Sequence, residues 1–295
     1  MLGLVVRPLV AGEENLFESM PDPLPELRQA SYAAGLAGGG YRPEHTWVAL
    51  QSGRLVCRAA WLLPPGAVGE PWLERFELRA EPEVGAALLR AAHEAFGGPK
   101  DYYASMPAGW RRDPQVRALV EAPMAAARLA GLVERAERLR FVWAGTSQPL
   151  AAGRFSFRPA RDAAEINGLV ARIAEPDLLT GAETARLVRG VDLARNPLDW
   201  LSGPPRDWRI AVEAGVPVGL AGATGDACFP MVAYLGVLDE TVRGELLADA
   251  VATLAEGGAL EVVADVDANR TAVVEDLARN GFKPIRCRIH FEPLK

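Results

Sequence analysis

One six-residue run places an arginine and small residues at the expected start of a helix. The run reads Arg243, Gly244, Glu245, Leu246, Leu247 and Ala248, and it follows the mostly apolar stretch 230–237. The first N–H groups of a helix have no partner within the helix, and they carry a partial positive charge. A diphosphate is an anion that such a helix start can hold. The run therefore predicts an anion-binding site, and an amphipathic surface helix with an ordinary arginine is the alternative.

A second stretch, 267–282, places polar groups close to this run. It reads DANRTAVVEDLARNGF, in which Asn269 has the type of an N-cap and Gly281 the type of a helix end. The polar candidates nearby are Asp265, Asp267 and Tyr234. Asp267 suits a helix start equally well, and Tyr234 suits a core strand, so neither receives a catalytic role.

Alternating strands and helices must position these residues. In 152–295 a first strand is followed by two helices, with Asp162 and Thr180 as predicted caps. A hairpin at 209–222 turns at Gly215. The half is completed by a strand at 230–237, a helix within 240–258, a strand at 259–266, a helix within 269–281, and a closing strand or pair of strands at 283–293. The predicted order is β-α-α-β-β-β-α-β-α-β, which is a mixed α/β sandwich.

The first half of the chain repeats this pattern in fainter form. "VVRPLVAGEE" near the N-terminus matches "SFRPARDAAE" at 156–165. "ALQSGRLVCRAA" at 49–60 matches "AVEAGVPVGLAG" at 211–222, and "AGLVERAERLRFVW" at 130–143 matches "NGFKPIRCRIHFEP" at 280–293. Three matches in one order predict one fold used twice, in domains 1–145 and 152–295. The segment 143–155, rich in Gly, Ser, Pro and Ala, is the predicted linker.

The element order and the two end motifs resemble the GNAT superfamily of acyl-CoA-dependent N-acetyltransferases. The resemblance is clear over 152–295 and faint over 1–145, and it implies two tandem GNAT-like domains that form a pseudo-dimer. It implies acetyl-CoA as the acyl donor, bound in the C-terminal domain. The cofactor-binding residues that it implies are the strand residues Leu235, Gly236 and Val237, the run Arg243, Gly244, Glu245, Leu246, Leu247 and Ala248, and Asn269. The strand would pair with pantetheine through backbone amides.

The chain departs from the family pattern Q/R-x-x-G-x-G/A at two positions. Leu246 stands where the pattern has glycine, so its side chain is expected to crowd the diphosphate. Leu277 stands where the family often has the tyrosine that protonates the departing thiolate. The catalytic residues are therefore unknown, and direct attack of an amine in a ternary complex gains mainly from positioning.

The N-terminal copy is expected to hold no cofactor. Its corresponding helix, within 76–96, begins at Glu81, Pro82 and Glu83. Two carboxylates repel a diphosphate, and the proline removes one N–H donor. Glu74 and Glu77 are possible bases, with a solvated strand face as the preferred interpretation. Four aromatic residues have two interpretations, as the lining of a pocket or, preferably, as packing and domain contacts: Tyr102, Tyr103, Trp110 and Trp208. We therefore expect one acetyl-CoA per chain.

Composition excludes several other classes of function. A formal net charge of −6 argues against nucleic-acid binding, and no apolar run approaches the roughly 20 residues of a membrane span. Cys57, Cys228 and Cys287 are scattered and lack metal-ligand spacing, which favours reduced thiols in the cytoplasm and predicts no metal. The expected acceptor is a small-molecule or peptide amine. The oligomeric state stays open, and the internal repeat makes a monomer plausible.

Two hypotheses remain from the sequence. The first is an N-acetyltransferase with its cofactor in the C-terminal domain, supported by Arg243, Ala248 and Asn269. The second is a non-catalytic tandem module that keeps the fold for binding a ligand or a protein, supported by Leu246 and Leu277. Acetyl-CoA binding discriminates between them.

Overall fold

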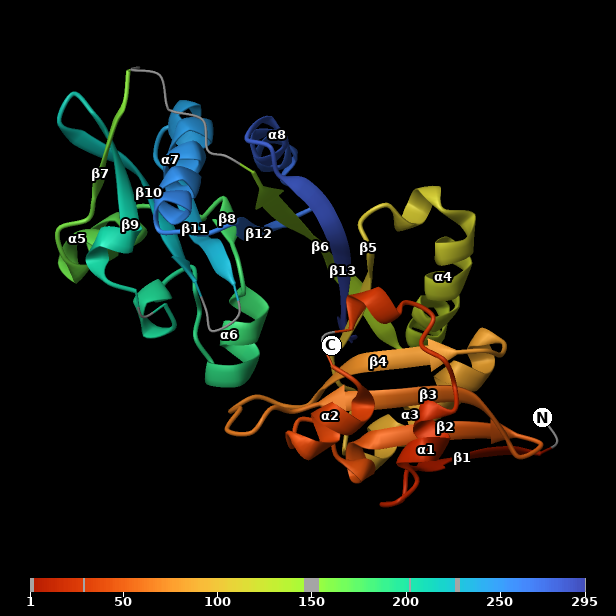
Figure 1. Ribbon diagram of the computed structural model, residues 1–295. Coiled ribbons are helices and arrows are strands. Elements are labelled where there is room, and N and C mark those ends of the chain that lie inside the picture. Colours follow the sequence, from red (N-terminus) through yellow and green to blue (C-terminus); the bar gives the residue numbers. More distant parts are fainter. Residues whose placement is uncertain (1–2, 29, 146–153, 202, 226–228, 295) are drawn as a thin grey trace. The chain divides into compact units, whose positions relative to one another are not determined.

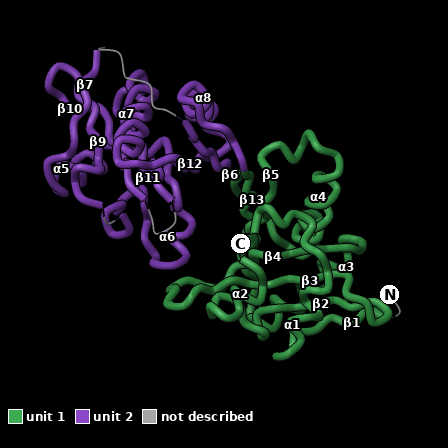
Figure 2. The backbone as a smooth tube through the Cα atoms, viewed as in Figure 1, with its two compact units in different colours: residues 1–137, 286–295 green, residues 138–285 purple. Residues whose placement is uncertain are grey.

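The computed structural model describes residues 3–28, 30–145, 154–201, 203–225 and 229–294. The chain forms two compact units, which are coloured separately in Figure 2. Unit 1 comprises residues 1–137 and 286–295, and unit 2 comprises residues 138–285. Both are α/β units with mixed sheets (Figure 1). Within the described ranges, no helix has the length and apolar character that a bilayer crossing requires.

Unit 1 contains a sheet in the order β1-β2-β3-β4-β5-β13, in which only β4 and β5 are parallel neighbours. Its strands are β1 (Leu4–Pro8), β2 (Thr46–Gln51), β3 (Arg54–Leu62), β4 (Trp72–Leu78) and β5 (Tyr102–Pro107), completed by part of β13 (Lys283–Pro293). Its helices are α1 (Glu14–Glu18), α2 (Tyr32–Ala37), α3 (Pro82–Ala95) and α4 (Pro114–Leu129). β6 (Leu132–Ala144) begins in this unit and ends in unit 2.

Unit 2 contains a sheet in the order β6-β12-β11-β10-β9-β7, with the short strand β8 paired to β11. Its strands are β7 (Ser156–Pro159), β8 (Leu178–Leu179), β9 (Trp208–Glu213), β10 (Val216–Gly225), β11 (Pro230–Val237) and β12 (Glu261–Asp267). Its helices are α5 (Ala163–Val170), α6 (Ala182–Arg189), α7 (Arg243–Glu256) and α8 (Thr271–Arg279). The element order predicted for 152–295 is confirmed, with β8 as one addition.

The hairpins and first helices follow from local sequence. Ser52-Gly53 and Ala214-Gly215 have positive φ at both residues, as a two-residue I′ hairpin turn requires. The Asp162 side chain accepts from the Glu165 N–H at 2.8 Å, so this predicted cap is confirmed. The predicted Thr180 cap is wrong, because Gly181 precedes α6 and the Thr180 hydroxyl donates to the Val232 carbonyl at 2.6 Å instead.

Each unit takes its last strand from the other repeat. Arg286–Phe291 of β13 pairs with Pro107–Tyr102 of β5 in unit 1. Arg138–Ala144 of β6 pairs with Asp267–Glu261 of β12 in unit 2. The units therefore differ from the predicted ranges 1–145 and 152–295. Most of the predicted linker, residues 146–153, lies outside the described residues, as does Cys228.

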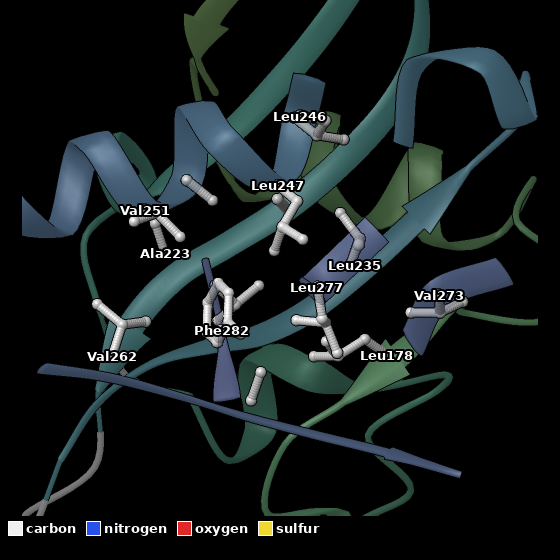
Figure 3. Packing of buried hydrophobic residues seen from close by; sticks show 14 of the residues in the cluster. Leu178, Ala223, Leu235, Leu246, Leu247, Val251, Val262, Val273, Leu277 and Phe282 are labelled. Atoms are coloured by element: carbon white, nitrogen blue, oxygen red, sulfur yellow. The ribbon is translucent and has the colours of Figure 1, made fainter. Parts of the chain in front are cut away.

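The core of unit 2 lies on both faces of its sheet. Alternate residues of β9 and β10 point to opposite sides, so Ala211 joins the cluster under α7 and α8, whereas Ile210 joins the cluster under α5 and α6. Figure 3 shows the first cluster, in which side chains from α7 and α8 meet those of β11 and β12. In unit 1, Phe17, Tyr32 and Tyr41 form an aromatic cluster beside β2 and β3.

Candidate functional site

Both units contain a pair of parallel strands that separate like a fork. Among the described residues, β11 and β12 pair only at Met231 and Val263, and β4 and β5 pair only at Leu73 and Tyr102. We call these pairs fork 2 (β11 and β12) and fork 1 (β4 and β5). Beyond the single pairing, the backbone groups that face the gap need other partners.

A β-bulge lies beside each fork. In β11 the register against β10 steps from Tyr234 to Val232, which leaves Ala233 as the extra residue. In β4 the register against β3 steps from Arg75 to Leu73, which leaves Glu74 as the extra residue. A bulge re-aims side chains and carbonyls at the edge of a ladder. The two repeats thus share a fork and a bulge at the same place in the fold.

Fork 2 is bridged by the chain's own residues 177–181. The Asp177 N–H donates to the Leu235 carbonyl at 2.7 Å, and the Thr180 N–H donates to the carbonyl of the bulged Ala233 at 3.0 Å. The Thr180 hydroxyl also accepts from the Asp265 N–H of β12 at 3.0 Å. Leu178 is buried beside Leu235 in the core cluster (Figure 3). The backbone of Leu235, which the sequence predicted to pair with pantetheine, therefore already pairs with β8.

The predicted phosphate ligand Arg243 lies in an internal ion cluster. Its side chain is only 9% exposed. Its Nε donates to Asp276 at 2.6 Å, and one terminal nitrogen donates to Asp177 at 3.2 Å. A buried guanidinium with two carboxylate partners has its charge balanced within the protein. Burial raises the pKa of Asp177, against the opposing effect of Arg243.

The 3₁₀ turn before α7 is capped by the chain itself, whereas α7 has no side-chain cap bond of its own. The Asp239 carboxylate accepts from the N–H and the hydroxyl of Thr241 at 2.9 and 2.7 Å, and a short 3₁₀ turn leads from there into Arg243. Gly244, Glu245 and Ala248 are partly exposed along α7. The carboxylate thus holds an N–H group of this turn and places a negative charge just before the helix start, where an anion would bind.

Leu246 and Leu247 point into the core (Figure 3). A Cβ on Gly219 of β10 would lie 2.9 Å from the Leu246 side chain, so this glycine makes room for the leucine. The expectation that Leu246 crowds the diphosphate is therefore wrong, because its side chain packs against the sheet. Gly236 is buried in the same close-packed way against Ile173, and Val237 is partly exposed.

Asn269 does not cap α8. It is exposed in the preceding turn, and Arg270 is the residue before the helix, without a side-chain cap bond. Leu277 is fully buried in the core of unit 2. The Tyr234 hydroxyl is buried without a hydrogen-bond partner among the described residues, and burial raises its pKa. Of the predicted cofactor-binding residues, the structure gathers Leu235 and Arg243 around β8, and Asn269 lies in an exposed turn.

Fork 1 encloses a cavity of about 30 Å³. It has about the volume that one or two water molecules need. The polar residues that line it are Arg28, Glu74, Glu77, Tyr102, Tyr103 and Ser105. Tyr102 and Tyr103 therefore do line a pocket, whereas Trp208 packs in the core of unit 2 and Trp110 is buried elsewhere in unit 1.

Glu77 is not on a solvated strand face, so that preferred interpretation is wrong. Its side chain is 3% exposed, and its two oxygens accept from Arg28 at 2.6 Å and from Arg58 at 2.9 Å. These charge-assisted hydrogen bonds fix the position of the carboxylate. The sequence carried no signal that Arg28 and Arg58, which are 49 and 19 residues away, would meet it.

Glu74 is the carboxylate of fork 1 that keeps partial access to solvent. Its side chain is 24% exposed, and one oxygen accepts from Arg288 at 2.7 Å and from the Trp72 indole at 3.0 Å. Arg288 comes from β13, so the exchanged strand contributes a residue to this fork. Its guanidinium lies over the Tyr103 ring, which also stacks on His290.

α3, beside fork 1, begins at the residues that the sequence predicted. Glu81 precedes the helix without a side-chain cap bond, Pro82 is its first residue, and Glu83 lies in the first turn. The fourth residue, Gly85, is buried, and a Cβ there would lie 2.8 Å from Ala126 of α4. Its small size serves the packing of two helices.

Comparisons with known proteins support the fold. No family model and no curated protein matches this chain. A GCN5-related N-acetyltransferase from Sphaerobacter thermophilus is 15% identical with a TM-score of 0.59, over 98% of this chain and 95% of that one. A glucosamine N-acetyltransferase region of a fungal GH3 β-N-acetylglucosaminidase is 13% identical with a TM-score of 0.54, over 98% of this chain and 38% of that one.

A tandem GNAT protein from the clavulanic acid biosynthesis pathway is 17% identical, with a TM-score of 0.46, over 99% of this chain and all of that one. The likeness to the first two structures extends over 98% of this chain, so it includes both repeats. The chain therefore has a fold like that of these GCN5-related N-acetyltransferases.

Proposed function

We propose that this protein is an acyl-CoA-dependent N-acetyltransferase that acetylates a small-molecule or peptide amine, with fork 1 as its acyl site. The observation that carries the proposal is the contrast between the forks. Fork 1 keeps a cavity of about 30 Å³ with a partly accessible carboxylate at its wall, and the side chains around it would move apart to admit an acetyl group. Fork 2 is bridged by residues 177–181. This departs from the C-terminal site that the sequence favoured.

The residues of fork 2 fit acetyl-CoA poorly. The Ala233 and Leu235 carbonyls, the Arg243 guanidinium and the Thr241 N–H all have partners within the chain. A ligand would have to displace each of these contacts, and the free energy of breaking them would reduce its net binding free energy. Fork 1 has no comparable backbone bridge among the described residues.

In fork 1 the proposed base is Glu74. The donor supplies an acetyl thioester, whose carbonyl carbon the acceptor amine attacks. The C–N bond forms as the C–S bond breaks, and the departing thiolate would take a proton from water and leave as the free thiol. Glu74 would take the proton that the amine loses, and Arg288 and the Trp72 indole would hold the carboxylate in place. Buried Phe76 and Tyr102 would shield the reacting groups from water.

The charge at the start of α3 bears on affinity. Glu81 and Glu83 flank the first turn, and Pro82 offers no N–H group. A diphosphate gains little there, because two carboxylates oppose it. We therefore expect the donor to be held mainly by its pantetheine and acyl parts, and to bind weakly.

Titration calorimetry of the full chain with acetyl-CoA, followed by a thiol-release assay with a panel of amines, tests the proposal. Glu74→Gln should lower turnover on the order of 100-fold while leaving acetyl-CoA affinity within about two-fold. Glu70→Gln is the matched control, because Glu70 is 76% exposed on the same unit. Turnover that survives Glu74→Gln would remove Glu74 from the reaction.

Arg243→Ala distinguishes the two forks. With fork 1 as the acyl site, this change should not weaken acetyl-CoA binding. A charge-assisted contact to phosphate is worth about 1.5–3 kcal/mol, so a loss of about ten-fold or more in affinity would support the C-terminal site instead.

A non-catalytic binding module is the second candidate. The observation that favours it is that both helix starts oppose a phosphate: Asp239 caps the turn before α7, and Glu81 and Glu83 flank α3. The same titration decides between the candidates. Absence of acetyl-CoA binding to the full chain would favour the binding module.

A further inference from the structure

The residues that bridge fork 2 belong to the connection between α5 and α6, residues 171–181. The corresponding connection in unit 1, residues 19–31, joins α1 to α2. In unit 1 this connection reaches the fork through side chains: Leu24 and Arg28 line the cavity, and Arg28 donates to the carbonyl of the bulged Glu74 at 3.5 Å. In unit 2 the connection enters the fork as a strand.

β8 occupies the fork with the pairing of a true sheet strand. Leu178 and Leu179 lie opposite Leu235 and Tyr234 in antiparallel register. The N–H groups of Asp177 and Thr180 extend this pairing on either side. An extended ligand that carries amide groups would need the same carbonyls of β11. β8 and such a ligand therefore exclude one another.

An ion cluster holds β8 against two helices. Asp177, the residue before β8, pairs with Arg243 at the start of α7, and Arg243 pairs with Asp276 of α8. Arg279 also contacts Asp276 at 2.7 Å. Two carboxylates and two guanidinium groups balance in charge. Because Arg243 and Asp276 are buried, loss of the Asp177 charge would leave this balance incomplete.

We propose that fork 2 is a second acyl-pantetheine site that the chain keeps closed with its own strand β8, held by the Asp177–Arg243 ion pair. The identity of the excluded ligand rests on the proposed function, whereas the closure itself rests on the contacts of β8. One acetyl-CoA per chain follows while β8 is in place. A second binding site follows once β8 is released.

Hydrogen exchange read by mass spectrometry tests the closure without any ligand. In the unaltered full chain, the amides of Asp177 and Thr180 should exchange at least about 100-fold more slowly than unstructured peptide. Asp177→Asn keeps the shape of the side chain and removes its charge, and it should speed exchange over 177–180 by about ten-fold or more. Asp192→Asn is the control, because Asp192 is 58% exposed in the same unit.

Titration with acetyl-CoA then tests the second site. The unaltered chain and Asp192→Asn should bind one equivalent, and Asp177→Asn should bind two. Amides at 177 and 180 that exchange at unstructured rates, or exchange that Asp177→Asn leaves unchanged, would overturn the closure. Faster exchange without a second equivalent would overturn the site. If no variant binds acetyl-CoA while the exchange behaves as expected, the proposed function fails and the closure stands.

Discussion

The gap between the two separating strands is stabilised by different contacts in fork 1 and in fork 2. At fork 1 the polar contacts come from side chains, with Arg28 on Glu77 and Arg288 on Glu74. Fork 2 is crossed by backbone, through β8. Side-chain ion pairs leave a cavity, whereas a paired strand fills the gap. A repeat can thus retain the whole element order while one short connection changes its conformation and fills the gap between two strands.

The helices that follow β4 and β11 also differ between the units, at a single position near their starts. α3 and α7 both have 14 residues, and their fourth positions are Gly85 and Leu246. Gly85 allows the close approach of Ala126, and Leu246 fits because Gly219 lacks a side chain. The size of the residue at this position is set by its packing partner in each unit.

The exchange of last strands gives the largest expected effect. Phe291 is fully buried in unit 1 and stacks on Tyr102, and Phe141 is buried in the core cluster of unit 2. Truncating a buried phenylalanine to alanine costs about 3–5 kcal/mol. We expect Phe291→Ala to destabilise unit 1 and Phe141→Ala to destabilise unit 2. In each case the destabilised unit is the one formed mainly by the other repeat.

Hydrogen exchange of the two hairpins reads the units separately. Protection of 46–62 should fall in Phe291→Ala, and protection of 208–225 should fall in Phe141→Ala, so each variant is the control for the other. The reverse assignment would show that each repeat keeps its own last strand in solution. The exchange also means that cutting the chain near residue 150 would leave each half without a strand of its sheet.

Local features of this fold were readable from the sequence, and the pairings at long range were not. The hairpins at Gly53 and Gly215 follow from a turn chemistry that needs positive φ. The exchange was hidden because 130–143 and 280–293 have matching patterns, so either strand suits either sheet. Arg243 was correctly placed at the start of α7, but its partner Asp177 is 66 residues away and gave no periodic signal.

A second difference between the units concerns pH, because all three histidines belong to unit 1. His93 is buried in α3 against Trp61, and burial lowers its pKa to about 4 from an ordinary 6.5. Below pH 6.5 the unfolded chain binds a proton that the folded unit does not. Stability is therefore lost as pH falls from 6.5 to 4, by about 2 kcal/mol at pH 5.

We expect the stability of unit 1 against urea to fall between pH 7 and pH 5 by more than that of unit 2. Pulsed hydrogen exchange at 46–62 measures the unfolding of unit 1. His93→Gln should remove most of the excess, because glutamine does not titrate. His45 lies in the same unit, and burial lowers its pKa too, so a small remainder is expected. An excess that His93→Gln leaves unchanged would assign the effect to other groups.

The smallest expected difference lies in an ion pair that both repeats carry. Arg7 pairs with Glu13 at 2.6 Å, and Arg158 pairs with Glu165 at 2.7 Å, with Arg161 as a further partner. The arginine partner lowers the pKa of both carboxyls below 4.5. Their contribution is therefore present above pH 4.5 and is lost as pH falls. Glu165 is 9% exposed and Glu13 is 33% exposed, so solvent screens the second pair more strongly.

We expect Glu165→Gln to lower the melting temperature by about 1–3 °C at pH 7, and Glu13→Gln to change it by less than about 1 °C, because exposed ion pairs contribute little. At pH 3 the difference between Glu165→Gln and the unaltered chain should shrink, since part of the Glu165 contribution has then gone. Calorimetry of the three proteins at both pH values measures this. A larger effect at Glu13, or an effect at Glu165 that grows as pH falls, would show that this repeated ion pair is not held as the structure has it.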